Sequence, residues 1–341
     1  LHCFFSISTP PFSATRKEMV LKVFFVFSSL FLFVSASWSS HPIVSFDEGF
    51  SHLFGDDNLM IQEHAVRLSL DERTGSGFIS QQMYMNGRFS ASIKLPKDYT
   101  AGVVVAFYMS NGDMFEKNHD EIDFEFLGNV KGKNWRVQTN IYGNGSTGTG
   151  REERYTLWFD PSENFHQYTI LWTDSQIIFY VDEIPIREVN RTPAMGGDFP
   201  SKPMSVYATI WDGSAWATGG GKYRVNYKYA PYTSDFADFI LHGCAVDPIQ
   251  QLPICDGGYS SGISPSQRRK MERLRSKFLT YSHCYDRARY KVPLPECVIT
   301  AGEEERLKSF DPVRFGGAGG RRRRSKSHHR VAPRLTNSMP M

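Results

Sequence analysis

The sequence predicts an all-β fold, either a sandwich or a barrel of short strands, over about residues 42–235. Short runs rich in β-branched and aromatic residues recur there, as in residues 88–94, 103–108, 168–172 and 177–181. Turn-forming residues separate such runs at residues 74–77, 86–87, 111–112 and 144–145. No long helical periodicity interrupts the pattern, and aromatic residues make up 14% of the chain, which favours strands.

Two N-terminal segments are excluded from this fold. Met19 precedes Lys22 and an apolar run over residues 23–34, which is typical of a signal peptide and too short to span a bilayer comfortably. We therefore expect residues 1–18 to be translated sequence upstream of the true start. Residues 19–36 are expected to be the signal peptide, whose cleavage leaves a secreted chain with no membrane partner.

Four of the five cysteines fall in the C-terminal third of the chain: Cys244, Cys255, Cys284 and Cys297. An even number in a secreted chain predicts two disulfides, for which three pairings are possible, and pairing of sequence neighbours would close two short loops. A zinc site made of the four thiolates is disfavoured, because no two of them lie two to four residues apart. We expect residues 236–300 to be a small extension with two disulfides, and we expect no metal or other cofactor.

A helix signal begins inside this extension at Ser264. Pro265 suits the first helical position, and Gln267 completes a capping box with Ser264. Four apolar residues at helical spacing predict the face directed into a core: Met271, Leu274, Phe278 and Tyr281. Four basic residues are expected to form the solvated side: Arg268, Arg269, Arg273 and Arg275.

Charge is distributed unevenly along the chain. Residues 37–311 carry 28 Lys and Arg against 35 Asp and Glu, which argues against a nucleic-acid-binding body. Residues 312–341 carry eight Lys and Arg and no acid, and they are rich in glycine, so we expect residues 301–341 to be a basic, disordered tail. Two sequons, at Asn144 and Asn190, predict N-glycosylation.

The segment 121–126 alternates acidic and apolar residues. Because side chains alternate along a strand, Glu121, Asp123 and Glu125 should share one face. Crowded like charges raise at least one carboxyl pKa, as a general acid requires. The Cα atoms of Glu121 and Glu125 would lie ~13 Å apart, and converging side chains can reach the carboxyl separation of ~5–5.5 Å that retaining glycosidases use. A merely exposed acidic strand or a calcium site are the alternatives, but calcium prefers ligands from several directions.

Residues 119–128, His-Asp-Glu-Ile-Asp-Phe-Glu-Phe-Leu-Gly, closely resemble the catalytic signature of plant xyloglucan endotransglucosylase/hydrolases, which belong to the β-jelly rolls of glycoside hydrolase family 16. The resemblance extends over about residues 42–300 and includes residues 53–56, 75–78, 89–96, 138–140, 165–166, 170–172 and 216–218, together with the four C-terminal cysteines. It implies a jelly-roll sandwich of two antiparallel sheets over residues 37–235, followed by the disulfide-linked, helix-containing extension.

The resemblance also implies the chemistry. Glu121 would be the nucleophile and Glu125 the general acid/base, with Asp123 assisting. The implied reaction cleaves the β-1,4-glucan backbone of xyloglucan by a retaining double displacement and rejoins it to another xyloglucan chain. Nine residues are implied to contact the substrate: Gln138, Thr139, Asn140, Arg151, Glu152, Ala215, Trp216, Gly220 and Arg289. A core position for Trp216 and a solvated charge for Arg289 are the alternatives.

Several functions remain open at this stage. Asn129-Val130-Lys131 stands where many family members carry a sequon, and the chain resembles a divergent branch that contains both transferases and hydrolases. The alternatives are a xyloglucan endo-hydrolase, a mixed-linkage or plain β-1,4-glucanase, and a non-catalytic glycan-binding jelly roll. We expect a monomer in the plant cell wall or apoplast, whose partners are xyloglucan donor and acceptor chains. The basic tail is a candidate for adhesion to acidic wall polysaccharide such as pectin.

Overall fold

The computed structural model describes residues 42–63, 65–246 and 262–310. The chain divides into two units, Leu1–Pro42 and Ile43–Met341, and the account below concerns the second. The predicted upstream segment, the signal peptide, Cys255 and the tail from residue 311 lie outside the described residues. Within the described ranges, no helix has both the length and the apolar character needed to cross a bilayer.

Among the described residues, far more belong to strands than to helices. The strands are β1 (Phe50–Phe54), β2 (Leu59–Ile61), β3 (Val66–Leu70), β4 (Ser76–Ser80), β5 (Met83–Lys94), β6 (Val103–Ser110), β7 (Glu121–Leu127), β8 (Arg136–Tyr142), β9 (Glu153–Thr156), β10 (His166–Trp172), β11 (Gln176–Val181), β12 (Ile184–Asn190), β13 (Ser205–Asp212), β14 (Tyr232–Val246) and β15 (Leu279–Ser282). The helices are α2 (Phe46–Gly49), α3 (Pro265–Phe278) and α4 (Ala301–Lys308), with short 3-10 turns at Asp56–Asn58, Pro193–Asp198, Tyr227–Tyr229 and His283–Tyr285.

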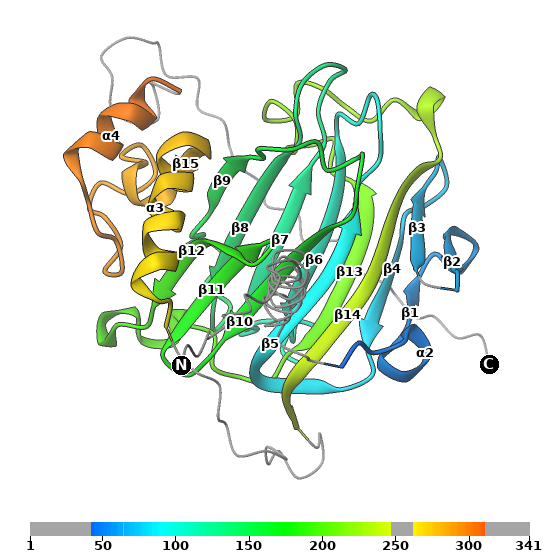
Figure 1. Cartoon of the computed structure of the whole chain (residues 1–341), viewed down its shortest axis with the longest axis horizontal. Helices are drawn as coiled ribbons and strands as arrows, with labels where there is room; N and C mark the ends of the chain where they lie inside the picture. The colour runs from blue at the N-terminus through cyan, green and yellow to red at the C-terminus, as the bar shows by residue number, and fades with distance from the viewer. Residues whose placement is uncertain (1–41, 64, 247–261, 311–341) are drawn as a thin grey trace, which may run out of the picture. The chain divides into compact units, whose positions relative to one another are not determined.

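Two antiparallel sheets pack against each other (Figure 1). The eight-stranded sheet has the order β1-β4-β13-β6-β7-β8-β9-β15, and the seven-stranded sheet has the order β12-β11-β10-β5-β14-β3-β2. The predicted jelly-roll sandwich of two antiparallel sheets is therefore confirmed.

The core lies between the sheets, and β7 shows why its register holds. Ile122, Phe124 and Phe126 are fully buried on the inner face, and the ring of Phe124 lies 5.1 Å from that of Phe179 on β11. Burying each such side chain contributes roughly 1.5–3 kcal/mol. A slip of one residue would expose all three apolar side chains and bury the acids, so the apolar alternation determines which way the acids point.

The turn predicted at Asn86-Gly87 is wrong, because β5 runs through it. Both residues have positive φ, 64° at Asn86 and 148° at Gly87, and the register with β14 shifts between Gly243 and Cys244. These features define a β-bulge, in which one extra residue is accommodated without ending the strand. A Cβ atom at Gly87 would lie 2.6 Å from the Cα atom of Gly243, so this position requires glycine.

The extension is continuous with the sandwich, which corrects the predicted boundary at residue 235. β14 crosses that boundary, and β15 of the extension pairs with β9 at the edge of the eight-stranded sheet. Cys284 and Cys297 form a disulfide, as neighbour pairing would require. Cys244 is also disulfide-bonded, and Cys255, its partner if sequence neighbours pair, lies outside the described residues.

Helix α3 begins as predicted. The Ser264 hydroxyl accepts a hydrogen bond from the Gln267 amide, and the Gln267 side chain accepts one from the Ser264 amide. Met271 and Leu274 are buried. Tyr281 was wrongly assigned to the helix, because α3 ends at Phe278 and Tyr281 lies in β15.

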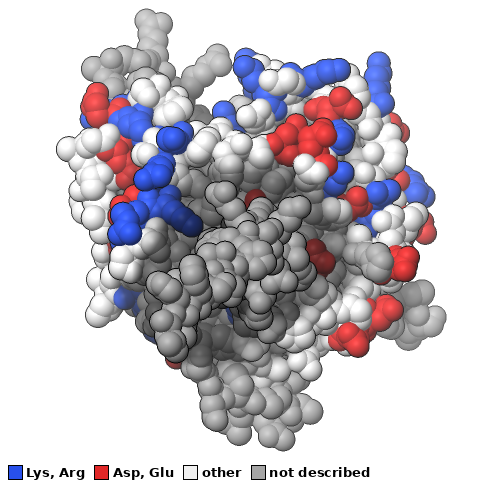
Figure 2. All heavy atoms as spheres, viewed as in Figure 1, with Lys and Arg blue, Asp and Glu red and all other residues white. Residues whose placement is uncertain are grey.

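The solvated side of α3 is smaller than predicted. Basic side chains gather on the outer surface of the helix, at the left of Figure 2. Arg275 does not belong to this surface: its side chain is 20% exposed and forms an ion pair with Glu153 of β9. The helix therefore contributes one arginine to the interior contact with the sandwich.

Residues 301–308 correct the predicted start of the disordered tail. They form α4, where Leu307 is fully buried in the main core. Arg306 donates a hydrogen bond of 2.6 Å to the carbonyl oxygen of Leu279. Burial of Leu307 explains why this helix holds its place despite the charged composition around it.

Candidate active site

The three acids of β7 project from the face of the eight-stranded sheet that points away from the core. We call this the carboxylate face. Neighbouring strands contribute the residues directly opposite each acid, because paired residues in antiparallel strands share a face. On β8 these are Tyr142 opposite Glu121, Asn140 opposite Asp123 and Gln138 opposite Glu125. On β6 they are Ser110, Tyr108 and Ala106, in the same order.

Glu121 is held by donors on both sides. The Tyr142 hydroxyl donates to Oε1 of Glu121 over 2.5 Å, and Nε2 of His119 lies 3.2 Å from the Tyr142 oxygen. Burial raises the pKa of Glu121 above its ordinary value, and hydrogen bonds from Tyr142 and Ser110 and the charge of His119 offset only part of this rise. These donors favour the ionised form and orient it, as a nucleophile requires.

Asp123 lies between the two glutamates and is buried. Burial, followed by the negative charges of Glu121 and Glu125, raises the pKa of Asp123 well above its usual value. The raised pKa favours the protonated form of Asp123, and the hydrogen bond between the two side chains lowers the pKa of Glu121. This hydrogen bond favours the ionised form of Glu121.

Glu125 is held by the amide of Gln138, where Glu121 is held by a tyrosine hydroxyl. Nε2 of Gln138 donates to Oε2 of Glu125 over 2.5 Å. Burial raises the pKa of Glu125 to about 7, an effect that the Gln138 hydrogen bond and the charge of Arg154 oppose and the charges of Glu121 and Glu152 support. A carboxyl with this pKa is protonated in weakly acidic solution and can act as a general acid.

The predicted substrate contacts on β8 lie on two different faces of the eight-stranded sheet. Gln138 and Asn140 lie on the carboxylate face, as predicted. Thr139 points the other way: it is fully buried, and its hydroxyl accepts a hydrogen bond of 2.9 Å from Arg187. Alternation along the strand excludes Thr139 from the carboxylate face, so its prediction as a substrate contact is wrong.

Arg151 and Arg289 pair with different acids. The Arg151 guanidinium is 1% exposed and binds Asp198 and Glu296, so it joins the β8–β9 connection to the extension instead of projecting from the carboxylate face. Arg289 of the extension donates to Oε2 of Glu152 over 2.5 Å. It is therefore no freely solvated charge, and its partner Glu152 acts on the pKa of Glu125.

The loop after β13 carries Ala215, Trp216 and Gly220. Trp216 is partly exposed, which argues against the core alternative, and its ring lies 6.1 Å from that of Trp211 on β13. Trp211 pairs with Val104 on the sheet, one row beyond Glu125. Gly220 has a φ of 68°, and no atom lies within 4 Å of where its Cβ would be, so the backbone there is open.

The site residues predicted from the sequence do not include five residues of the carboxylate face: Tyr108, Ser110, Tyr142, Arg154 and Trp211. Tyr142 was detectable, because it continues the i, i+2 alternation of Gln138 and Asn140. Tyr108 and Trp211 depend on which strands neighbour β7, and sequence order does not reveal this: β6 and β13 pair although about a hundred residues separate them.

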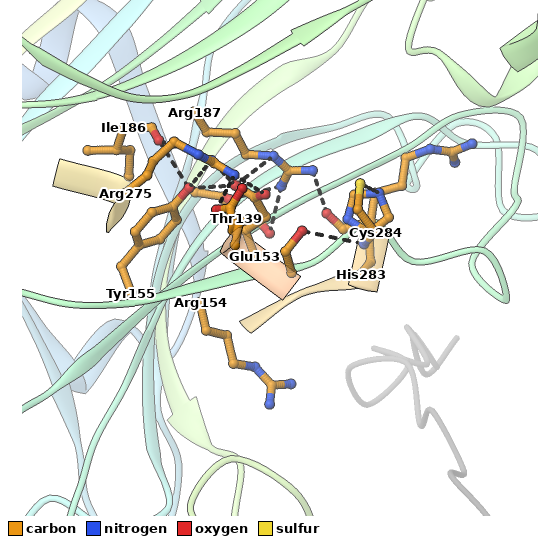
Figure 3. A network of polar contacts seen from close by, with 12 residues as sticks. Thr139, Glu153, Arg154, Tyr155, Ile186, Arg187, Arg275, His283 and Cys284 are labelled. Carbon is orange, nitrogen blue, oxygen red and sulfur yellow. Dashed lines mark hydrogen bonds and ion pairs between the residues drawn. The ribbon is translucent and has the colours of Figure 1, made fainter. Parts of the chain in front are cut away.

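The opposite face of β9 anchors the extension, as Figure 3 shows. Arg275 of α3 binds the two oxygens of Glu153 over 2.6 and 2.8 Å, and it donates to the Tyr155 hydroxyl over 2.8 Å. Arg187 of β12 lies 3.7 Å from Glu153 and bonds to Thr139. This buried network ties α3 to β9, which pairs with β8 of the carboxylate face.

Other predicted sites can be placed as well. Asn144 and Asn190 are both exposed, as glycosylation would require. One group of three potential metal ligands converges within the described ranges, namely His283, Cys284 and Cys297. Its two sulfurs are joined in a disulfide, so they are not available as thiolate ligands.

Comparison with known proteins gives two family matches. The profile of glycosyl hydrolases family 16 matches residues 46–229, and the profile described as xyloglucan endo-transglycosylase (XET) C-terminus matches residues 253–297. The Arabidopsis thaliana protein named probable xyloglucan endotransglucosylase/hydrolase protein 27 is 65% identical over 311 residues, covering 88% of this chain and 93% of its own length. Protein 28 of the same plant is 61% identical over 321 residues, covering 91% and 97%. A solved lichenase from a mouse hindgut metagenome is 24% identical, with a TM-score of 0.48 over 59% of this chain and 97% of its own.

Proposed function

The chain belongs to the xyloglucan endotransglucosylase/hydrolases of glycosyl hydrolase family 16, and from this we propose that it cleaves the β-1,4-glucan backbone of xyloglucan and rejoins it to another xyloglucan chain. The observation that carries the proposal is the contrast between two carboxyls on one face of β7. Burial raises the pKa of both carboxyls, but several donors hold Glu121 and favour its charge, whereas the pKa of Glu125 reaches about 7. A retaining mechanism needs one carboxylate and one carboxylic acid.

In the first half-reaction, an oxygen of Glu121 attacks the anomeric carbon while Glu125 gives its proton to the departing 4-oxygen. The glycosidic C–O bond breaks, an ester bond to Glu121 forms, and the chain with the new 4-hydroxyl leaves. In the second, Glu125 is ionised and takes the proton of an incoming 4-hydroxyl, whose oxygen displaces Glu121 from the anomeric carbon. Water in place of that hydroxyl would give hydrolysis.

The contacts of the extension support transfer to a sugar. Arg289, which is partly exposed, and the buried Glu152 form a donor–acceptor pair whose acid acts on Glu125, the residue that activates the incoming group. Trp216 and Trp211 offer aromatic surface of the kind on which sugar rings stack. Gln138 and Asn140 supply amides that can bind sugar hydroxyls.

The test supplies unlabelled xyloglucan with a labelled xyloglucan oligosaccharide and measures label in polymer together with new reducing ends. Transfer predicts incorporation without new ends, whereas new ends without incorporation would show a hydrolase. Glu121→Ala should abolish both signals and preserve binding to xyloglucan. Glu163→Ala is the matched control, because this exposed acid forms its ion pair with Lys97, over 3.1 Å, and not with a residue of the carboxylate face. Turnover by Glu121→Ala would exclude the mechanism.

We further propose a setting for this activity. The signal-like segment at residues 19–36 and the exposed sequons at Asn144 and Asn190 support secretion to the cell wall as a glycoprotein. The proposed partners are xyloglucan donor and acceptor chains, with acidic wall polysaccharide contacting the basic tail. Retention on isolated walls, compared before and after removal of residues 312–341, tests the last point: equal retention would exclude it.

A further inference from the structure

Arg154 lies on β9 directly opposite Gln138 of β8. In Figure 3 its side chain points away from the Glu153 network that anchors the extension, toward the opposite face of the strand. Nε of Arg154 donates to Oε1 of Gln138 over 2.6 Å, and Nε2 of Gln138 donates to Glu125 over 2.5 Å. The three side chains thus form a chain of hydrogen bonds that ends on the general acid/base.

The direction of this chain follows from the donor inventory of its members. A guanidinium has only donors, so Arg154 can bind only the oxygen end of the Gln138 amide. The amide nitrogen is then turned toward Glu125. Without Arg154, the Gln138 amide could rotate and present its oxygen to a protonated Glu125. The hydrogen bond from Arg154 therefore sets the amide orientation in which Gln138 donates to Glu125.

Arg154 is itself held by the C-terminal extension. Its guanidinium carbon lies 5.0 Å from the ring centroid of Tyr281 on β15, within the range of a cation–π contact. The Tyr281 hydroxyl donates to Asp286 over 2.8 Å, which fixes the ring. Tyr281 is 127 residues from Arg154 in sequence, so the contact exists only because β15 joins the sheet beside β9.

We propose that Arg154 and Tyr281 are positioning residues for Glu125, through which the C-terminal extension sets the orientation and the proton affinity of the general acid/base. The proposal rests on the proposed function, because it assigns to Glu125 the acid/base role. It adds a role for the extension in the chemical step itself, apart from contacts with the acceptor chain.

The charges around Glu125 predict the sign of the effect. The titratable and charged groups that face it or its immediate neighbours are Glu121 and Asp123 of β7, Tyr108 of β6, Tyr142 of β8, Glu152 and Arg154 of the β9 segment, and Arg289 of the extension. Glu121 and Glu152 raise the pKa of Glu125, and Arg154 lowers it. Loss of Arg154 should therefore raise the pKa of Glu125. Because activity requires protonated Glu125, the alkaline limb of kcat/KM should then move to higher pH.

The experiment compares pH profiles of kcat/KM for xyloglucan between wild type and Arg154→Met. The variant should shift the alkaline limb upward by about 0.5–1 unit and lower kcat by on the order of 10-fold. Arg136→Met is the matched control, because Arg136 is an exposed cation two residues from Gln138 on the same strand. Its alkaline limb should coincide with that of wild type.

A second pair of variants, at Tyr281, tests the proposal independently of how well Arg154→Met folds. Tyr281→Phe preserves the ring and should keep the wild-type limb, whereas Tyr281→Leu removes the ring and should shift the limb in the same direction as Arg154→Met. In a Gln138→Leu background, the shift caused by Arg154→Met should shrink. If the wild type is active and the alkaline limb of kcat/KM shifts in neither Arg154→Met nor Tyr281→Leu, the positioning role is overturned. Inactivity of wild type itself would instead count against the proposed function.

Discussion

Replacement of Arg275 by methionine tests whether one buried ion pair docks the extension. Arg275 of α3 bonds to both oxygens of Glu153 over 2.6 and 2.8 Å, and the side chains are only 20% and 5% exposed. Methionine keeps most of the apolar stem and removes the charge. Glu153 would then retain Arg187, at 3.7 Å, and the Tyr155 hydroxyl, at 2.5 Å.

The expected loss of stability follows from these contacts. Removing one partner of a buried pair costs about 3–5 kcal/mol, because the other charge stays buried. The remaining partners of Glu153 place the value near the lower end, about 3 kcal/mol. For a domain of this size, such a loss lowers the melting temperature by roughly 6–12 °C.

The effect should also depend on pH. Burial raises the pKa of Glu153, but the charge and hydrogen bonds of Arg275, and then the charge of Arg187, lower it below its ordinary value of 4.5. A carboxyl with a depressed pKa stabilises the fold above its unfolded-state pKa, and this contribution is lost as the pH falls through the folded-state pKa. The difference between wild type and Arg275→Met should therefore be full above pH ~5 and shrink in more acidic solution.

Thermal unfolding followed by circular dichroism measures the change. Arg269→Met is the matched control on the same helix, because Arg269 is exposed, and it should stay within about 0.5 kcal/mol of wild type. Adding Glu153→Gln to Arg275→Met should recover part of the loss, since the uncompensated charge is removed. A melting temperature for Arg275→Met equal to that of Arg269→Met would refute the reasoning.

Three further perturbations follow from the same contacts. Tyr142→Phe removes the donor to Glu121, which costs about 1.5–3 kcal/mol for a charged acceptor; we expect a loss of roughly 10–100-fold in kcat/KM and an acidic limb moved to higher pH, since the lost bond lowered the pKa of Glu121. Because the raised pKa of Asp123 favours its neutral form, which hydrogen-bonds to Glu121, Asp123→Asn should retain more activity than Asp123→Ala in the transfer assay, and equal losses would contradict this role. Replacing both Cys284 and Cys297 by serine removes a disulfide across a sequence separation of 13, and should lower stability by about 3 kcal/mol in thermal unfolding; an unchanged melting temperature would show that the bond does not constrain the unfolded chain.

The sequence alone determined the features that depend on local periodicity. Alternation in residues 121–126 predicted the shared face of Glu121, Asp123 and Glu125, and it holds because each apolar neighbour gains by burial. The same rule places Gln138 and Asn140 on that face and excludes Thr139, which had been assigned there by resemblance alone. The capping box at Ser264 was likewise readable, since a helix start depends only on residues within one turn.

The tertiary structure decided everything that depends on partners distant in sequence. Asn86-Gly87 carries the residues of a turn, yet pairing with β14 makes it a bulge. Arg275 was expected in solvent because helical spacing says nothing of Glu153, which lies 122 residues away. Periodicity specifies which face a side chain takes, whereas its charge partner and its pKa depend on which strands and helices the folded chain brings against that face.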